Sequence, residues 1–217
     1  MSTARGQDAL LSSDAVLQRA AERLAQHFAG MVNEETVERV VFESYAALGR
    51  TATVSTHLPA LAEKFARDRL TALAQSKGLV AKPVPEVLYV CVQNSGRSQM
   101  AAALTRQLSG GRVHVRSAGS QPAAGILPSV AEVLAEIGID VGQDFPKPLT
   151  DDVVRAADAV VTMGCGDACP IYPGKRYLDW PLADPAGLDL DGVRAVRDDI
   201  RDRVEHLLAE LTSAPPR

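Results

Sequence analysis

The sequence predicts an α/β domain with a four-stranded parallel sheet flanked by helices, preceded by a small three-helix bundle. Residues 1–82 contain three stretches with helical periodicity and no stretch typical of a strand. From Val87 onward, short apolar runs alternate with helical patterns, which is the order typical of a parallel sheet. Between these parts, Lys82-Pro83-Val84-Pro85 forms an extended joint, because proline disfavours helix at its own position and at the preceding one. We therefore expect two domains, residues 1–82 and 86–213.

The helices of the first domain are amphipathic and are expected at roughly 14–30, 33–49 and 59–78. Asn33 is a suitable N-cap for the second of them, and Pro59 suits the first turn of the third. Short connections between amphipathic helices indicate an antiparallel bundle. A bundle of this size has a limited core, so we expect it to share apolar surface with a second copy and to support a homodimer.

The second domain contains four strand-like runs, at Val87–Val90, Val113–Arg116, Ala159–Met163 and Arg176–Trp180. The first run is apolar and rich in β-branched residues, as in a buried parallel strand. Helical patterns follow or separate these runs, at Ser98–Leu108, Ser129–Glu136, Asp151–Ala156 and Val193–Leu211. The alternation places the loops after the strands at one edge of the sheet, where ligands of such sheets bind.

The loop after the first strand has the composition of an oxyanion site. Cys91 and Arg97 are separated by five residues, and helix-forming residues follow at once. A loop in this position directs backbone N–H groups inward above a helix N-terminus, which favours a bound anion. Arg97 adds a planar fork of donors, and the same positive field stabilises a thiolate, so Cys91 is the candidate nucleophile. The residues expected to contact the anion are Gln93, Asn94, Ser95, Gly96, Arg97 and Ser98.

Two further segments can contribute to chemistry at this edge. Cys165 and Cys169 follow the third strand, and a C-x3-C pair could be half of a zinc site. The chain has three cysteines in all and so lacks a second pair, which favours a redox couple over a metal. Asp184, in an Asp-Pro turn after the fourth strand, could donate a proton to a departing oxygen.

Composition excludes several classes of function. The net charge is −4 and the isoelectric point is about 5.6, which argues against a surface for nucleic acid or for an anionic membrane. No apolar run is long enough to span a bilayer, and the N-terminus lacks the layout of a signal peptide. We therefore expect a cytoplasmic protein whose thiols are reduced and available for chemistry.

Four motifs occur in the order seen in a known family: C-V-Q-N-S-G-R-S-Q-M-A, S-A-G-S, V-V-T-M-G-C-G-D-A-C-P and D-P-A-G. Together they make Pro85–Leu211 resemble the arsenate reductases with the low-molecular-weight tyrosine phosphatase fold, of the thioredoxin-coupled type. The helical start of the chain is similar to an extension found in some actinobacterial members.

The resemblance implies a role for each candidate residue. Cys91 would attack arsenate, Arg97 would bind its oxygens, and Asp184 would protonate the leaving hydroxyl. Cys165 would then attack Cys91 and release arsenite, and Cys169 would take over the disulfide for thioredoxin to reduce. No tightly bound cofactor or metal is implied.

Three alternatives stay open. The C-x3-C spacing is shorter than is usual in thioredoxin-coupled members, and related members use one cysteine with mycothiol and mycoredoxin as external reductant. A low-molecular-weight tyrosine phosphatase would use the same nucleophile, arginine and acid, but Gln99 and Ala186 stand where such phosphatases carry a proline and an aromatic residue. A sensor of oxyanions without catalytic activity is a third possibility.

Overall fold

The computed structural model describes residues 13–52, 56–164 and 169–213, and it divides into two compact units, Met1–Ala81 and Lys82–Arg217. The first unit contains the three predicted helices: α2 (Ser13–His27), α3 (Glu34–Gly49) and α4 (Leu58–Ser76). Asn33 caps α3 as predicted, since its side-chain oxygen accepts a hydrogen bond from the N–H of Thr36 at 2.9 Å. The apolar stripes of the helices form the core of this unit, with Leu17, Leu24, Val37, Val41, Phe65 and Leu70 buried.

The second unit is built on a sheet of four parallel strands, β1 (Glu86–Cys91), β2 (His114–Gly119), β3 (Ala159–Met163) and β4 (Arg176–Asp179). The strand order is β2-β1-β3-β4, so β1 lies inside the sheet between β2 and β3. All six residues of β1 are buried, as its apolar composition predicts. The predicted fold class is confirmed.

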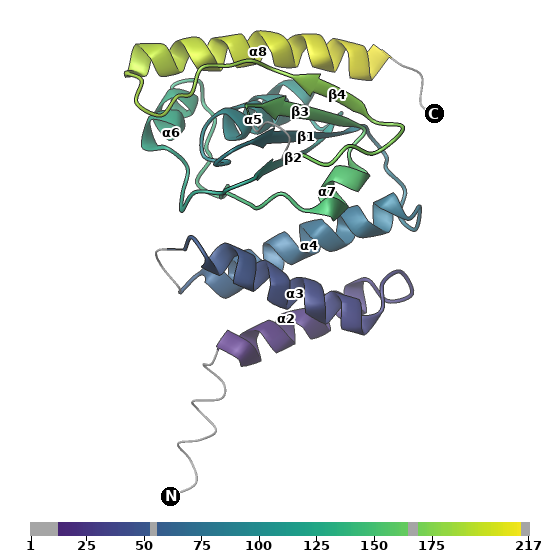
Figure 1. Cartoon of the computed structure of the whole chain (residues 1–217). Coiled ribbons are helices and arrows are strands. Elements are labelled where there is room, and N and C mark those ends of the chain that lie inside the picture. The colour runs from purple at the N-terminus through teal and green to yellow at the C-terminus, as the bar shows by residue number, and fades with distance from the viewer. Residues whose placement is uncertain (1–12, 53–55, 165–168, 214–217) are drawn as a thin grey trace, which may run out of the picture. The chain divides into compact units, whose positions relative to one another are not determined.

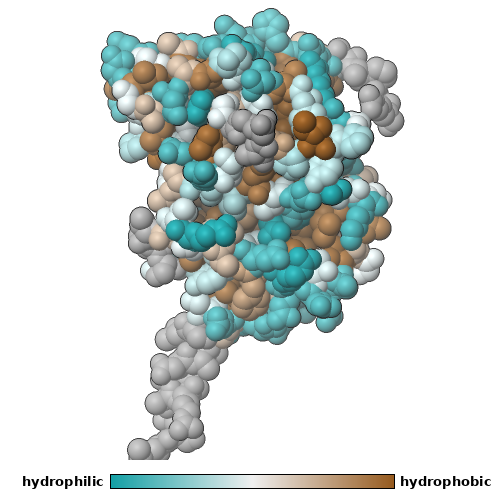
Figure 2. All heavy atoms as spheres, in the orientation of Figure 1, coloured by the Kyte–Doolittle hydropathy of each residue, from teal (hydrophilic) through white to brown (hydrophobic). Residues whose placement is uncertain are grey.

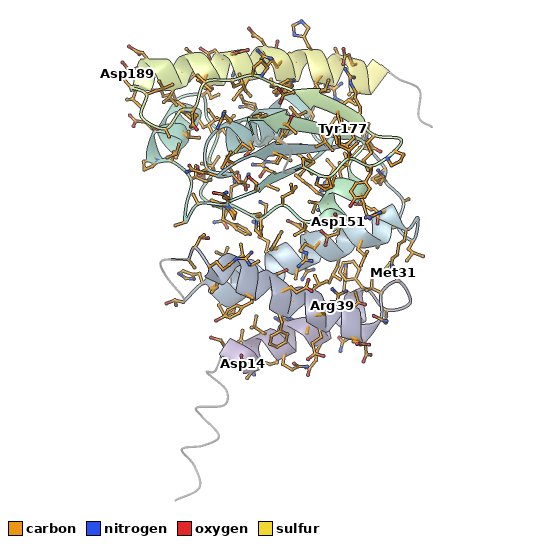
Figure 3. All side chains as sticks on the ribbon, viewed as in Figure 1. Asp14, Met31, Arg39, Asp151, Tyr177 and Asp189 are labelled. Carbon is orange, nitrogen blue, oxygen red and sulfur yellow. The ribbon has the colours of Figure 1, made fainter. Side chains whose placement is uncertain are left out.

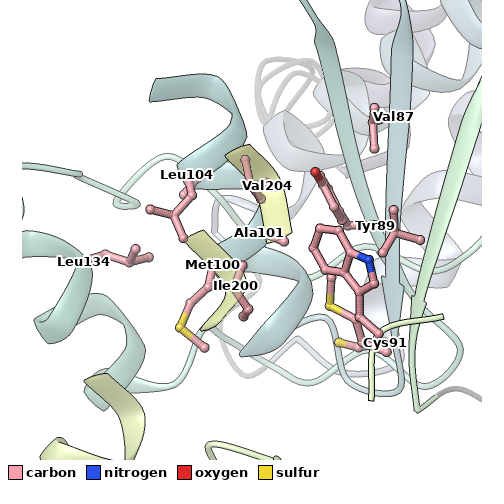
Figure 4. Packing of buried hydrophobic residues seen from close by; sticks show 14 of the residues in the cluster. Val87, Tyr89, Cys91, Met100, Ala101, Leu104, Leu134, Ile200 and Val204 are labelled. Carbon is pink, nitrogen blue, oxygen red and sulfur yellow. The ribbon is translucent and has the colours of Figure 1, made fainter. Parts of the chain in front are cut away.

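Helices cover both faces of this sheet. They are α5 (Arg97–Ser109), α6 (Pro128–Ala135), α7 (Asp151–Ala156) and α8 (Leu190–Ser213). Figure 1 shows α8 on one side of the sheet and α7 on the other. In Figure 4, Tyr89 and Cys91 lie on β1 beside residues of α5 and α8, including Met100 and Ile200. The end of β1 that carries Cys91 is therefore fixed by the core of the domain.

β2 and α8 extend furthest beyond a predicted end. β2 continues past Arg116 to Gly119, because Ser117, Ala118 and Gly119 pair in register with Tyr89, Val90 and Cys91 of β1. α8 begins three residues before Val193, at Leu190, because Asp189 caps it. The Asp189 carboxylate accepts from the N–H of Gly192 at 2.8 Å, and its carbonyl accepts from that of Val193 at 3.0 Å.

A buried ion pair lies at the N-terminal ends of β1 and β2, opposite the end of β1 that carries Cys91. The carboxylate of Glu86 accepts from the guanidinium of Arg116 at 2.5 Å, and both side chains are almost fully buried. The carboxylate of Asp158 accepts from the N–H of Glu86 and from Lys82. These contacts join β1, β2 and the residue before β3, so they fix the register of the strands.

None of the described helices combines the length and the apolar composition needed to cross a membrane. On the face shown in Figure 2, small groups of hydrophobic residues are separated by hydrophilic ones.

Candidate active site

The predicted site lies where three parallel strands end together. In the register of the sheet, Cys91 at the end of β1 is opposite Gly119 at the end of β2 and Met163 at the end of β3. The loop from Cys91 to α5 therefore adjoins both the Gly119 turn and the segment that begins at Gly164. A side chain at any of these ends is within the same small region.

The backbone of the loop is oriented with its carbonyl groups outward. The carbonyls of Val92, Gln93 and Ser95 accept hydrogen bonds from N–H groups of the segment 121–127, at 2.8–3.0 Å. In contrast, no acceptor for the N–H groups of Gln93, Ser95, Gly96, Arg97 or Ser98 occurs among residues 13–52, 56–164 and 169–213. These N–H groups precede or open α5, which is the arrangement of backbone donors that the sequence predicts for an anion nest.

The sulfur of Cys91 receives two contacts within the loop. It lies 2.9 Å from the hydroxyl oxygen of Ser98 and 3.2 Å from the backbone nitrogen of Asn94. The cysteine is buried, with 3% of its surface exposed. Both groups can donate a hydrogen bond to the sulfur, so they hold Cys91 in place within the loop.

Asn94 determines the shape of the loop. It is the one described residue other than glycine with positive φ, at 49°, and its side chain is fully buried. Its amide donates to the hydroxyl of Ser98 at 2.8 Å, and its amide oxygen accepts from the N–H of Lys147 at 2.8 Å and from Gln99 at 3.2 Å. Because Ser98 accepts from Asn94, its hydroxyl hydrogen is available to donate to Cys91. Its own N–H is engaged with the Cys91 sulfur instead of open to an anion.

Two glycines permit the close approach of neighbouring segments. A Cβ at Gly119 would lie 2.7 Å from the carbonyl oxygen of Val92 and 2.9 Å from the nitrogen of Asn94. A Cβ at Gly96 would lie 2.6 Å from Cγ of Pro185. The first contact holds the end of β2 against the loop, and the second holds the Asp-Pro turn against it.

Arg97 and Asp184 form an ion pair at the open side of the loop. The Nη2 of Arg97 donates to Oδ2 of Asp184 at 3.0 Å, and its Nη1 donates to the carbonyl of Leu182 at 3.3 Å. The arginine side chain is largely buried, whereas that of Asp184 is 59% exposed. Asp184 is oriented by the N–H of Ala186, which donates to its Oδ1 at 3.0 Å. The guanidinium of Arg97 and the carboxyl group of Asp184 thus lie side by side, as the predicted site requires.

Of the two further cysteines, Cys165 lies outside the described residues and Cys169 is buried. Of the cysteines that the structure describes, Cys91 and Cys169, neither is in a disulfide. Gly164, which precedes Cys165, has positive φ, and a Cβ there would lie 3.1 Å from Nη1 of Arg97. The start of this segment therefore lies against the arginine of the loop.

Sequence reasoning did not assign roles to Gln99, Lys147 and Tyr177. Gln99 is fully buried and donates to the carbonyls of Asn94 and Phe145. A polar residue on the apolar side of a helix was the available signal for it. Lys147 donates its backbone N–H to Asn94, and the hydroxyl of Tyr177 accepts from the N–H of Tyr172 in the segment after Cys169; no sequence pattern reports either contact. Among the described residues, no group of three His, Cys, Asp or Glu side chains could hold a metal ion.

Comparison with protein families gives two matches along the chain. Residues 17–74 match the model described as the N-terminal domain of protein-tyrosine-phosphatase-like proteins. Residues 86–215 match the model of low molecular weight phosphotyrosine protein phosphatases.

Individual relatives are named as arsenate reductases. The structure is similar to that of the thioredoxin-dependent arsenate reductase of Corynebacterium glutamicum, with 50% identity, a TM-score of 0.83, and coverage of 92% of this chain and 98% of that one. The glutaredoxin arsenate reductase of a Synechocystis species is 32% identical over 130 residues, which are 58% of this chain and 98% of the relative. Arsenate reductase 1 of Staphylococcus epidermidis is 34% identical over 123 residues, which are 55% of this chain and 92% of the relative.

Proposed function

Because the chain belongs to the arsenate reductases of the low-molecular-weight phosphotyrosine protein phosphatase family, we propose that it reduces arsenate to arsenite, with Cys91 as the nucleophile. The observation that carries this proposal is the position of Cys91 at the start of a loop whose N–H groups at 93 and 95–98 have no acceptor among the described residues, with Arg97 at the end of the same loop. This arrangement suits attack on the central atom of a bound tetrahedral oxyanion.

Arsenate binds to the N–H groups at 93 and 95–98 and to Arg97. Arg97 donates to Asp184, so an incoming oxyanion takes the place of that carboxylate as partner of the guanidinium. The nest is formed before substrate arrives, because the outward hydrogen bonds of the loop carbonyls hold its backbone. Such preorganised donors stabilise developing charge without a cost of reorientation.

In the first step, the Cys91 thiolate forms a bond to arsenic, and a hydroxyl leaves with a proton from Asp184 as water. Ser98 holds the thiolate before attack, and Asn94 orients Ser98. The contact of Pro185 with Gly96 holds the turn of Asp184 over the loop.

In the second step, Cys165 attacks the Cys91 sulfur. A Cys91–Cys165 disulfide forms, the sulfur–arsenic bond breaks, and its electron pair reduces arsenic, which leaves as arsenite. Cys169 then attacks Cys165, forms the Cys165–Cys169 disulfide and regenerates the Cys91 thiolate. Gly164 lies against Arg97 and directly precedes Cys165 in the chain, which supports the role of Cys165. An intramolecular relay benefits from a high effective concentration of thiol.

Thioredoxin is the external reductant in this proposal, and no cofactor is tightly bound. The name of the Corynebacterium relative supports thioredoxin, whereas that of the Synechocystis relative indicates glutaredoxin for a more distant member. A reducing cytoplasm is the compartment that maintains such a thiol relay.

The proposal is tested by measuring the steady-state turnover of arsenate, once with thioredoxin and its reductase and once with mycothiol and mycoredoxin. We expect arsenite to form with thioredoxin, and we expect Cys91→Ser to abolish it. Ser109→Ala is the matched control and should retain turnover. It also alters a small buried polar side chain, but one at the far end of α5.

Other outcomes identify the alternatives. Turnover with mycothiol alone, unaffected by Cys165→Ser and Cys169→Ser, would replace the relay with a single-cysteine mechanism. Hydrolysis of a phosphotyrosine peptide without arsenate turnover would make the protein a phosphatase.

A further inference from the structure

Ile171 is the most exposed large hydrophobic side chain that the structure describes, and it lies two residues after Cys169. Its side chain is 81% exposed, compared with 49% for Leu79 and 40% for Leu188. An isolated exposed leucine or isoleucine is common on protein surfaces and needs no explanation by itself. The surroundings of Ile171 distinguish it.

The backbone on both sides of Ile171 is held by one side chain. The hydroxyl of Tyr177 accepts a hydrogen bond from the N–H of Tyr172 at 2.8 Å and donates to the carbonyl of Pro170 at 3.2 Å. Tyr177 belongs to β4, so the sheet itself fixes the segment 170–172. A side chain held outward in this way loses little backbone entropy when a partner covers it.

Tyr172 is held from the other side. Its hydroxyl donates to Asp151 at 2.5 Å, and its ring lies under the guanidinium of Arg155, 4.1 Å from the ring centroid. Figure 3 shows Asp151 and Tyr177 on the same side of the domain, consistent with their shared contacts to Tyr172. Ile171 therefore projects from a segment that is anchored to both β4 and α7.

A hollow adjoins this segment. It has a volume of about 270 Å³, and Ser120, Leu149, Thr150, Asp151 and Pro170 line it. Together, Ile171 and the hollow give a small apolar projection beside a concave, partly polar surface. A protein partner can cover this combination with a flat apolar loop, because the buried centre of such an interface needs one apolar anchor within a polar rim.

We propose that Ile171 and the adjoining hollow form the docking surface for the external dithiol protein that reduces the chain after each turnover. This inference rests on the proposed function and names the surface that its reductant uses. The occupant follows from Cys169, which precedes Ile171 by two residues, since a protein that reduces a disulfide at Cys169 must cover this part of the surface.

The redox step is an exchange of two electrons. A thiolate of the partner attacks the disulfide sulfur of Cys169 and forms a mixed disulfide, releasing the other cysteine as a thiol. The second thiol of the partner then displaces Cys169, so the partner leaves oxidised and both thiols of the chain are regenerated. Ile171 takes no part in this exchange; it places the partner.

The test compares the full-length protein with Ile171→Ser, and uses Leu79→Ser as the matched exposed hydrophobic control. We expect Ile171→Ser to raise the KM for a bacterial thioredoxin roughly tenfold or more, which is the effect of losing one buried apolar anchor. The kcat at saturating thioredoxin and the yield of arsenite in a single turnover should be unchanged. Reduction of the oxidised protein by dithiothreitol, which needs no docking surface, should also be unchanged. Leu79→Ser should match the wild type in all four measurements.

Tyr177→Phe tests the support of the segment. It removes the hydroxyl that joins Tyr172 and Pro170, and we expect a smaller rise in KM with the same unchanged kcat. An unchanged KM for Ile171→Ser overturns the proposal, as does an equal slowing with dithiothreitol, which would mean that the disulfide itself had been disturbed. If light scattering shows that Ile171→Ser converts a dimer to a monomer while KM is unchanged, the surface instead binds a second copy. If the wild type forms no arsenite in a single turnover, the function fails, independently of the docking surface.

Discussion

Replacing Asn94 should damage the loop more than the loss of a single side chain suggests. Asn94→Ala removes the hydrogen bonds of the side chain to Ser98 and to the N–H of Lys147, both 2.8 Å, and a longer one from Gln99; the two shorter bonds are each worth about 1 kcal/mol. It also places alanine at a φ of 49°, where a Cβ costs about 1 kcal/mol more. We therefore expect the free energy of unfolding of the α/β domain to fall by about 3 kcal/mol.

Asn94→Gly is the matched variant, because it loses the same hydrogen bonds and tolerates the positive φ. We expect a loss of about 2 kcal/mol for it. Urea unfolding followed by the fluorescence of Trp180 measures both values. Trp180 is the one tryptophan of the chain and is buried in the core of this domain, so it reports on this domain.

Activity should fall in both Asn94 variants, because Ser98 loses the donor that orients its hydroxyl toward Cys91. We expect a loss of roughly tenfold or more in kcat/KM for arsenate, which corresponds to about 1.4 kcal/mol of lost stabilisation.

A midpoint of unfolding equal to that of the wild type in Asn94→Ala would refute the reasoning. Equal stability of the Ala and Gly variants would show that the backbone conformation contributes nothing.

Three further predictions concern other parts of the chain. Gly96→Ala should displace the Asp184 turn, because the new Cβ would lie 2.6 Å from Cγ of Pro185, and kcat for arsenate should fall at least tenfold. Gly125→Ala is the control and should match the wild type, because a Cβ there would meet nothing within 4 Å. Glu86→Gln removes the buried charge that pairs with Arg116, so urea unfolding followed by Trp180 fluorescence should show a loss of about 3 kcal/mol in the free energy of unfolding; a loss under 1 kcal/mol would contradict this. Deletion of residues 1–81 should leave a folded α/β domain that still reduces arsenate. Light scattering should show a dimer for the full-length protein and a monomer for the truncated one; monomers in both cases would exclude the dimer.

The order of the elements and the position of the loop could be predicted because the signals are local. A buried β-branched run, a glycine and a run of helix formers meet within a few residues around Cys91. The ends of two elements could not be predicted in this way. Ser117, Ala118 and Gly119 have little strand propensity, and their conformation is imposed by pairing with β1.

The support of the loop also depends on contacts far apart in the sequence. Asn94 bonds to Lys147, and Gly119 meets Val92, across separations that no periodicity reports. The sequence assigned Asn94 to the anion site, whereas the structure adds that its side chain is turned into the core of the loop. Patterns of residue types therefore predict which residues gather at the site, and tertiary contacts decide which of them face the substrate.

In the proposed relay, one chain passes two electrons from its own thiols to arsenate. The most direct test mixes prereduced protein with one equivalent of arsenate, without any external reductant, and then measures arsenite and maps the disulfides by peptide mass spectrometry. The relay predicts one arsenite per chain and a disulfide between Cys165 and Cys169, with Cys169→Ser trapping Cys91–Cys165 instead. Absence of arsenite until a small thiol is added, followed by recovery of Cys91 joined to that thiol, would contradict the relay.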